Sequence, residues 1–168
     1  MTTIPTTDSS DKGETEVEVR LASVSDALLL ATFRWELRSS FHQVTEDNAA
    51  FVERCASWMQ ERLRSSRWKC WIADWRKTPV GSVWTQLVEK IPNPISEPEY
   101  YVYLTNFYVR EQYRDKGIGS MLLSTIVAWS RSNNAESIIL WPTERSKPFY
   151  LRHGFSTAAE LMQRQVRE

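Results

Sequence analysis

The chain has 168 residues, a length that suits a single domain with a sizeable hydrophobic core. Lys and Arg together number 21, as do Asp and Glu, so the whole molecule offers no electrostatic attraction to nucleic acid or to an anionic membrane. No apolar run is long enough to span a membrane, and the N-terminus lacks the layout of a signal peptide. Two cysteines and two histidines provide neither a disulfide framework nor a metal-site spacing. We therefore expect a cytoplasmic protein with no metal, no nucleic-acid partner and no membrane partner.

In chain order, residues 1–15 are mostly polar and have little to bury, which predicts a disordered tail before a single domain over 16–168. Apolar residues that recur at helical spacing, and runs of β-branched and aromatic residues, predict the remaining elements. These are a strand over 17–21, a helix from 25, a helix over 45–64, a hairpin of strands 68–75 and 80–88, a proline-containing loop over 90–99, a strand over 101–109, a helix to about 132, a strand over 137–141, a short helix, and a last strand near 160–166. This order predicts a mixed α/β (α+β) sheet with helices on both faces.

Several side chains are expected in the core because they fall on the apolar face of an element. Cys55 and Cys70 are predicted to be small core residues, and Trp58 and Trp129 to be packing residues at helical core spacing. Other tryptophans, Trp84 among them, either fill the core or line a pocket for an apolar or aromatic amine.

The run at 113–119, Tyr-Arg-Asp-Lys-Gly-Ile-Gly, lies between a predicted strand and an amphipathic helix. Such a turn directs free backbone N–H groups and the positive end of the helix dipole at one spot, which suits a phosphate. Gly117 and Gly119 let a ligand approach the backbone because they lack a Cβ, while Arg110, Arg114 and Lys116 add positive charge. An ordinary strand-to-helix turn has the same spacing, so the run by itself favours neither interpretation.

Two common phosphate motifs do not fit. The Gly-x-x-x-x-Gly-Lys-Ser/Thr string of a P-loop is absent. A dinucleotide-binding fold would require a third glycine near Leu122 and an acidic residue after the next strand, which instead ends in Leu140 and Trp141.

Two segments carry a resemblance to a known family. Arg-Asp-Lys-Gly-Ile-Gly at 114–119 matches the Gln/Arg-x-x-Gly-x-Gly/Ala signature of the GNAT superfamily of N-acetyltransferases. Residues 141–155 resemble the later motif of that family, a short helix that bears a tyrosine and ends in Gly-Phe. The resemblance, which spans about residues 100–155, implies the GNAT-type acyl-CoA N-acyltransferase fold with acetyl-CoA as the co-substrate.

The resemblance also implies which residues contact acetyl-CoA. The backbones of Phe107, Tyr108 and Val109 would line the pantetheine arm, with the Val109 N–H as a donor to the developing oxyanion. The pyrophosphate loop would comprise Arg114, Asp115, Lys116, Gly117, Ile118, Gly119 and Ser120.

The later motif supplies three further candidates. Tyr150 corresponds to the tyrosine that lies near the CoA sulfur in the family and can protonate it; the alternative is that Tyr150 only packs the short helix. Thr143 stands where the family often has an asparagine that contacts pantetheine, and Ser146 follows it. Both hydroxyls are cofactor-binding candidates, and both equally suit a cap of the short helix.

No general base can be assigned. Some relatives place a glutamate on the central strand, where this chain has Thr105 and Asn106. The acidic residues and histidine of the region that shapes the acceptor pocket in the family are more often solvated. They are Glu36, His42, Glu46 and Asp47.

Three functions remain open at this point. The first is an acetyl-CoA-dependent N-acetyltransferase that moves acetyl to a primary amine of a small molecule or peptide by direct attack in a ternary complex. The second is a non-catalytic acyl-CoA-binding or sensing module, and the third is an interaction protein without a cofactor. The resemblance also allows a homodimer.

Overall fold

The computed structural model describes residues 16–157 and 162–166, so the predicted tail over 1–15 lies outside the described residues. Its elements are β1 (Val17–Leu21), a 3-10 turn η1 (Val24–Asp26), α1 (Ala27–Ser39), α2 (Asn48–Leu63), β2 (Trp68–Trp75), β3 (Thr78–Glu89), β4 (Tyr100–Val109), a 3-10 turn η2 (Glu111–Tyr113), α3 (Ile118–Ser132), β5 (Ala135–Ile139) and α4 (Lys147–Arg152). No helix in this described part of the chain is long and apolar enough to cross a membrane.

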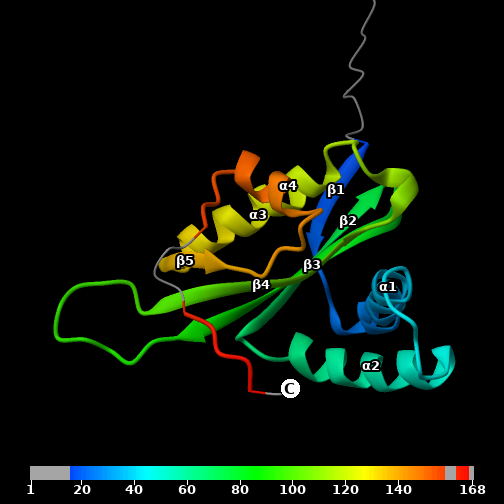
Figure 1. Ribbon diagram of the computed structural model, residues 1–168, viewed down its shortest axis with the longest axis horizontal. Helices are drawn as coiled ribbons and strands as arrows, with labels where there is room; N and C mark the ends of the chain where they lie inside the picture. The colour runs from blue at the N-terminus through cyan, green and yellow to red at the C-terminus, as the bar shows by residue number, and fades with distance from the viewer. Residues whose placement is uncertain (1–15, 158–161, 167–168) are drawn as a thin grey trace, which may run out of the picture.

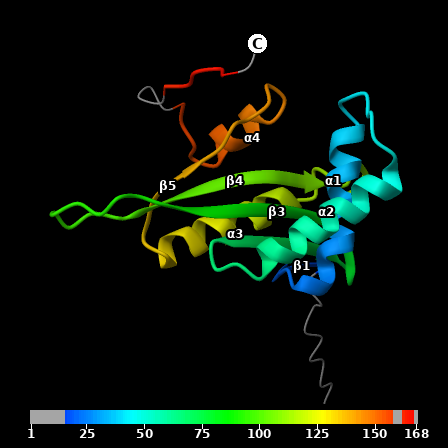
Figure 2. The same ribbon diagram turned by 90° about the horizontal axis from the view of Figure 1, so that it is seen from below.

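The strands form one mixed sheet in the order β1-β2-β3-β4-β5, in which β1 to β4 are antiparallel and β5 runs parallel to β4. Helices α1 and α2 lie on one side of this sheet, while α3 and α4 lie on the other (Figure 1). From below, α2 crosses in front of the strands and α3 passes behind them (Figure 2). The prediction of a mixed α+β sheet with helices on both faces is confirmed.

Each face of the sheet has its own core. The apolar face of α3, including Leu122 and Ile126, packs on Val83, Val102 and Leu104 of the central strands. On the opposite face, residues of α1 and α2 pack on inward side chains of β2, β3 and β4. The second core comprises Ala27, Leu30, Ala31, Phe33, Ala56, Met59, Cys70, Ile72, Trp84 and Tyr108.

Most predicted boundaries lie within two or three residues of the observed ones, and local contacts explain the differences. The helix predicted from Ser25 opens instead as the turn η1, where Asp26 accepts from the Ser23 N–H at 2.7 Å and from Arg20. Helix α2 begins at Asn48 because the carboxylate of Asp47 caps it, accepting from the Ala50 N–H at 3.2 Å.

Three other predictions need correction. Residues 162–166 of the last predicted strand are irregular, and its first two residues lie outside the described part of the chain. Trp58 is 40% exposed and is therefore not a core residue, and Cys55 is only half-buried. Trp129 does pack inside, at 5.2 Å from the ring of Trp71, and Cys70 is fully buried.

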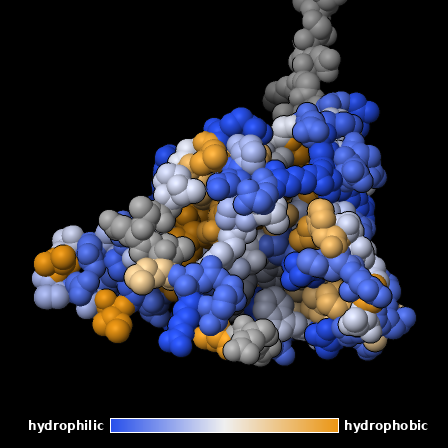
Figure 3. All heavy atoms as spheres, in the orientation of Figure 1, coloured by the Kyte–Doolittle hydropathy of each residue, from blue (hydrophilic) through white to orange (hydrophobic). Residues whose placement is uncertain are grey.

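The loop between β3 and β4 is exposed, as its prolines predict. Ile91 and Ile95 are 89% and 66% exposed, and hydrophobic side chains protrude from this loop in the space-filling view (Figure 3). Lys90 fixes the base of the loop by contacting the Glu136 carboxylate at 2.7 Å and the Pro98 carbonyl at 2.9 Å.

A bulge in β4 decides which side chains face α1 and α2. The pairing passes from Ser82 opposite Tyr108 to Trp84 opposite Thr105, so β4 contains one more residue than β3 over this stretch. Asn106, at the bulge, has a left-handed backbone with φ of 49°. A bulge of this kind interrupts the alternation of side chains along a strand. Thr105 and Asn106 consequently face the same side of the sheet, toward α1 and α2.

The other edge of β4 is open over its C-terminal half. Pairing with β5 ends at Tyr103 opposite Ile139, although β4 continues to Val109. The parallel strands therefore diverge beyond this point. The divergence leaves a length of strand edge with no β5 partner beside the start of α3.

Candidate active site

The start of α3 presents free backbone donors. Gly117, the N-cap residue, has a φ of 77°, a left-handed conformation that favours glycine, and Asp115 also has a positive φ of 61°. The Met121 N–H is the first to bond within the helix, to the Gly117 carbonyl at 3.0 Å. The N–H groups of Ile118, Gly119 and Ser120 therefore have no helical acceptor and point out of the helix end. Together with the helix dipole, these free donors suit an anion.

The basic side chains of this loop are held by neighbouring groups. Arg114 donates from Nε to the Val109 carbonyl at 3.1 Å, which fixes its guanidinium at the end of β4. The Lys116 ammonium lies 4.9 Å from the ring centroid of Trp75 and 5.4 Å from that of Tyr113, both within cation–π range. Arg114 thus lies closer to the strand end than Lys116, which is turned toward aromatic rings.

Ser120 and α4 are linked through a histidine. His153 Nδ1 lies 2.7 Å from the Phe149 carbonyl and must donate to it, and His153 Nε2 shares a hydrogen bond of 2.9 Å with the Ser120 hydroxyl. A Cβ at Gly119 would lie 3.4 Å from the Phe149 ring, an ordinary contact. The Ser120 side chain is therefore engaged by α4, and packing alone would accept a small side chain at position 119.

The backbone of β4 points alternately toward β3 and toward the open edge. The Arg110 N–H donates to the Val80 carbonyl of β3 at 2.8 Å. Because successive backbone groups of a strand face opposite sides, the Tyr108 N–H also faces β3, whereas those of Phe107 and Val109 face the open edge. Two of the three predicted pantetheine contacts thus have their main-chain groups on the open edge, and Tyr108 does not.

Tyr150 lies across this edge on α4 and is 8% exposed. Its ring packs 6.3 Å from Phe107, 5.2 Å from Phe149 and 5.4 Å from Phe155, between ring centroids. Burial raises the pKa of the Tyr150 hydroxyl to about 12. Among the described residues, no group hydrogen-bonds to this hydroxyl. Tyr150 therefore packs α4 against β4 and also carries a phenol that stays protonated at neutral pH.

Thr143 and Ser146 bond to each other at the start of α4. The Thr143 N–H donates to the Ser146 Oγ at 2.9 Å, and the Ser146 N–H donates to the Thr143 Oγ1 at 3.2 Å. The Ser146 hydroxyl also donates to the Thr143 carbonyl at 3.1 Å. These reciprocal bonds close the turn that precedes α4, while the Ser146 side chain makes no cap hydrogen bond to an N–H of the helix itself.

Comparison with known proteins decides the family. Residues 30–155, about three quarters of the chain, match the model of the acetyltransferase (GNAT) family. The chain belongs to the GNAT family. No curated protein matches its sequence. The family uses acetyl-CoA and transfers its acetyl group, so this GNAT protein is an acyltransferase.

Solved structures of similar fold agree with this assignment. A GCN5-related N-acetyltransferase from Ralstonia eutropha superposes with a TM-score of 0.73 at 22% identity, covering 90% of this chain and 99% of that one. An acetyltransferase from Clostridium acetobutylicum with acetyl-CoA gives 0.75 at 19% identity, covering 89% and 96%. An aminoglycoside N-acetyltransferase in complex with CoA gives 0.66 at 14% identity, covering 90% and 95%. Such identities establish the fold.

The carboxylates considered as bases are engaged in this GNAT protein. Glu36 accepts from Arg110 at 2.8 and 3.0 Å and from the Tyr108 hydroxyl at 2.9 Å. Burial raises the pKa of Glu36, but these hydrogen bonds outweigh it and hold the pKa below its usual value. Glu46 pairs with Arg54 at 2.6 Å, and Asp47 caps α2. These contacts give Glu36 a structural role, tying α1 to the end of β4.

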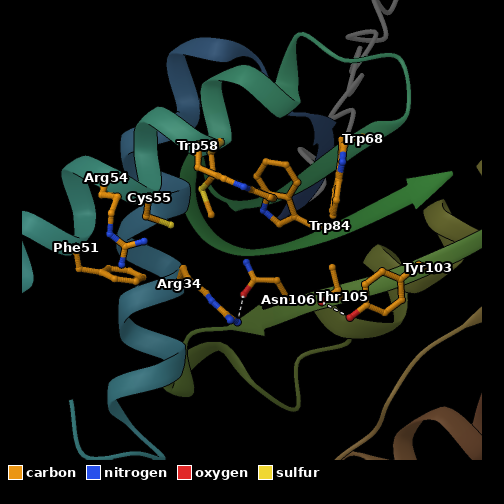
Figure 4. Close-up of a pocket in the computed structure, with 11 residues that line it drawn as sticks. Arg34, Phe51, Arg54, Cys55, Trp58, Trp68, Trp84, Tyr103, Thr105 and Asn106 are labelled. Carbon is orange, nitrogen blue, oxygen red and sulfur yellow. Dashed lines mark hydrogen bonds between the residues drawn. The ribbon is translucent and has the colours of Figure 1, made fainter. Parts of the chain in front are cut away.

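A pocket of about 350 Å³ lies between α1, α2 and the sheet, on the side of β4 opposite α3 (Figure 4). Five aromatic rings and a set of polar side chains make up most of its wall, and we call it the aromatic pocket. The rings are Phe51, Trp58, Trp68, Trp84 and Tyr103, and the polar side chains include Arg34, Thr105 and Asn106.

Sequence reasoning missed most of this pocket. Arg34 stands among apolar residues of α1 and has no motif around it, so nothing in the sequence marked it. Trp84 was left open between core and pocket; it is 2% exposed and also lines the pocket. Thr105 and Asn106 were noted only for lacking a carboxylate, and the bulge that turns both toward the pocket has no sequence signature. Among the described residues, no cluster of His, Cys, Asp and Glu is arranged to hold a metal ion.

Proposed function

We propose that this GNAT protein is an acetyl-CoA-dependent N-acetyltransferase that transfers acetyl to a primary amine by direct attack within a ternary complex. One observation carries the proposal. The open edge of β4 runs between the free N–H groups of α3 and the buried phenol of Tyr150, with the aromatic pocket on the far side of the same strand. The arrangement brings a set of anion donors, a free strand edge, an acidic hydroxyl and the aromatic pocket to one place. A module that only binds acyl-CoA would need neither the acidic hydroxyl nor the aromatic pocket.

The residues at this place fit acetyl-CoA. The N–H groups of Ile118, Gly119 and Ser120, together with Arg114, would hold the pyrophosphate. The backbones of Phe107 and Val109 would bond the pantetheine amides in the manner of an added strand. Acetyl-CoA, when bound, supplies a thioester whose carbonyl carbon is open to a nucleophile.

The protein side of the reaction follows from these groups. A neutral amine forms the new N–C bond and the C–S bond breaks, while the amine loses a proton to solvent. The Val109 N–H, on the open edge, would donate to the carbonyl oxygen as negative charge develops there. Tyr150, protonated because burial raises its pKa to about 12, would donate its proton to the departing sulfur. No carboxylate is assigned as base, so we propose that the amine arrives deprotonated or loses its proton through water.

Calorimetric titration with acetyl-CoA tests the binding half of the proposal. Gly119→Asp places a carboxylate beside the predicted pyrophosphate, whereas the matched Gly119→Ala adds only a Cβ that the fold accommodates at 3.4 Å from Phe149. An acid in the first turn of a helix does not disfavour folding. We therefore expect Gly119→Asp to fold and to lose at least tenfold in affinity, about 1.4 kcal/mol, relative to Gly119→Ala.

Release of free CoA thiol in the presence of a panel of amines tests the catalytic half. Amine-dependent thiol release at rates well above hydrolysis supports transfer. Tight acetyl-CoA binding without transfer to any amine would favour the sensing module, and binding by both Gly119 variants that equals wild-type binding would remove the anion site from the proposal.

A further inference from the structure

The aromatic pocket carries a positive charge that no carboxylate balances. Its wall includes two arginines and no Asp or Glu. Arg54 is neutralised by Glu46 at 2.6 Å, but Arg34 pairs with no carboxylate among the residues that the structure describes. The Arg34 side chain donates from Nη1 to the Oδ1 of Asn106 at 3.1 Å, as Figure 4 shows. A guanidinium has five N–H donors, so this bond orients Arg34 and leaves other donors for a ligand.

A second donor in the same wall also has no partner. The indole of Trp84 is 2% exposed, yet its Nε1–H makes no hydrogen bond within the described part of the chain. Figure 4 shows this nitrogen on the side of the ring that faces Asn106, toward Arg34. Buried N–H groups are nearly always paired in proteins, so this unpaired donor is available to an acceptor atom on a ligand. Arg34 and Trp84 together suit a carboxylate.

The aromatic wall discriminates between two kinds of ligand. Tryptophan faces can surround a cation, but here protein cations already occupy two of the rings. The Arg62 guanidinium lies 4.5 Å from the centroid of Trp58, and that of Arg54 lies 5.4 Å from the centroid of Phe51. A further cation would also meet the unbalanced charge of Arg34. The wall therefore favours an uncharged aromatic or large apolar group.

We propose that the acceptor is a small primary amine that also bears a carboxylate and an aromatic or large apolar side chain, the class to which tryptophan and phenylalanine belong. The inference rests on the proposed N-acetyltransferase function and names its substrate. The carboxylate bonds Arg34 and the Trp84 Nε1–H, and the side chain lies against the rings. The amine lies toward Thr105 and Asn106, at the bulge within the open part of β4.

The size of the pocket agrees with this class. About 350 Å³ is near the lower end of the roughly 300–1,000 Å³ that small-molecule sites occupy. That volume suits one amino acid rather than a folded protein or a long polycation. The unbalanced positive charge likewise disfavours amines with several ammonium groups.

Matched amines isolate the carboxylate. Tryptamine is tryptophan without its carboxylate, and phenethylamine stands in the same relation to phenylalanine. We expect kcat/KM to be higher for each amino acid than for its decarboxylated partner. In Arg34→Gln this ratio should fall by about tenfold to a hundredfold, the range expected for losing charge-assisted hydrogen bonds in a half-buried site. Comparing ratios between variants cancels the different basicities of the two amines.

The control is Arg38→Gln. It removes the same charge from an exposed position one turn along α1, outside the pocket wall, and should keep the wild-type ratio. Melting temperatures of both variants exclude a general loss of structure. Carboxylate recognition is wrong, while the transferase function stands, in either of two cases. In the first, wild type acetylates tryptamine and tryptophan with equal kcat/KM. In the second, Arg34→Gln lowers the kcat/KM values of the two amines by the same factor.

If no amine is turned over, the proposed function is wrong and equilibrium binding decides the inference by itself. Tryptophan and tryptamine are then titrated into the protein with CoA present. Binding of tryptophan that exceeds that of tryptamine, and that Arg34→Gln abolishes, supports the carboxylate site. Equal binding of the two amines, or binding of neither, overturns it.

Discussion

Tyr150→Phe separates catalysis from packing, because the two roles of this residue depend on different atoms. The ring makes the contacts with Phe107, Phe149 and Phe155, and phenylalanine keeps that ring. The hydroxyl has no hydrogen-bond partner among the described residues, so its removal leaves no protein group unsatisfied. We expect the free energy of unfolding to change by less than about 1 kcal/mol. For a chain of this length that corresponds to a shift in Tm of no more than about 4 °C.

Activity should respond very differently. If the Tyr150 hydroxyl protonates the leaving sulfur, kcat should fall by roughly 10²- to 10⁴-fold, while the Kd for acetyl-CoA stays within about twofold. Thiol release at saturating amine gives kcat, and calorimetry gives Kd. The matched control, Tyr100→Phe, removes a tyrosine hydroxyl from the start of β4, distant from the open edge, and should leave both values unchanged.

The pH profile adds an independent measure. Because burial raises the pKa of Tyr150 to about 12, ionisation of this residue should not lower the wild-type kcat below about pH 10. A Tyr150→Phe variant that retains full kcat with every accepted amine would leave Tyr150 as a packing residue only.

Three further outcomes follow from the contacts. Gly117→Ala meets no atom within 4 Å but forces alanine to a φ of 77°, so we expect a loss of about 1 kcal/mol in thermal unfolding together with weaker acetyl-CoA binding. Arg110→Gln removes the charged hydrogen bonds to Glu36, and solvent weakens these bonds because both side chains are nearly a third exposed. We expect the free energy of unfolding to fall by about 1 kcal/mol in denaturant titration. An unchanged midpoint would contradict a structural role for the Arg110–Glu36 pair. The pKa of Glu36 is lowered in the folded state, so the stabilisation that its carboxylate provides is complete above the unfolded pKa of 4.5 and is lost as pH falls through the folded pKa. Below about pH 4.5, the free energy of unfolding of Glu36→Gln should therefore decrease less with falling pH than that of wild type.

The turn that we propose as the acetyl-CoA site could be predicted from the sequence because backbone atoms build it. A glycine at a left-handed N-cap, a second glycine two residues later and a following amphipathic helix are visible as residue types at fixed spacing. The short helix with Tyr150 was visible for the same reason. The roles of side chains were harder to predict from the sequence. Ser120 hydrogen-bonds to His153, and Thr143 to Ser146, and these contacts depend on how α4 packs against the sheet.

The proposed acceptor side was not predictable because it depends on a change of register. Regular alternation along β4 would put Thr105 and Asn106 on opposite faces, and only the extra residue opposite β3 brings both to the aromatic pocket. The partner of Asn106, Arg34, is 72 residues away in sequence and belongs to a helix whose pattern predicts only burial. Trp58 illustrates the same limit, since helical spacing placed it in the core and the structure leaves it 40% exposed in a pocket wall.

The bulge would also let one strand serve both of the proposed substrates. Past it, the N–H groups of Phe107 and Val109 face the open edge, where the thioester would lie. At it, the side chains of Thr105 and Asn106 face the aromatic pocket, where the amine would lie. Asn106 holds Arg34 at 3.1 Å, so the residue that interrupts the strand also orients the charge that we propose selects the acceptor. An Asn106→Gly variant, which keeps the left-handed backbone but releases Arg34, should therefore weaken selection for carboxylate-bearing amines more than it weakens acetyl-CoA binding. A variant in which both properties fell together would indicate that the bulge itself had been lost.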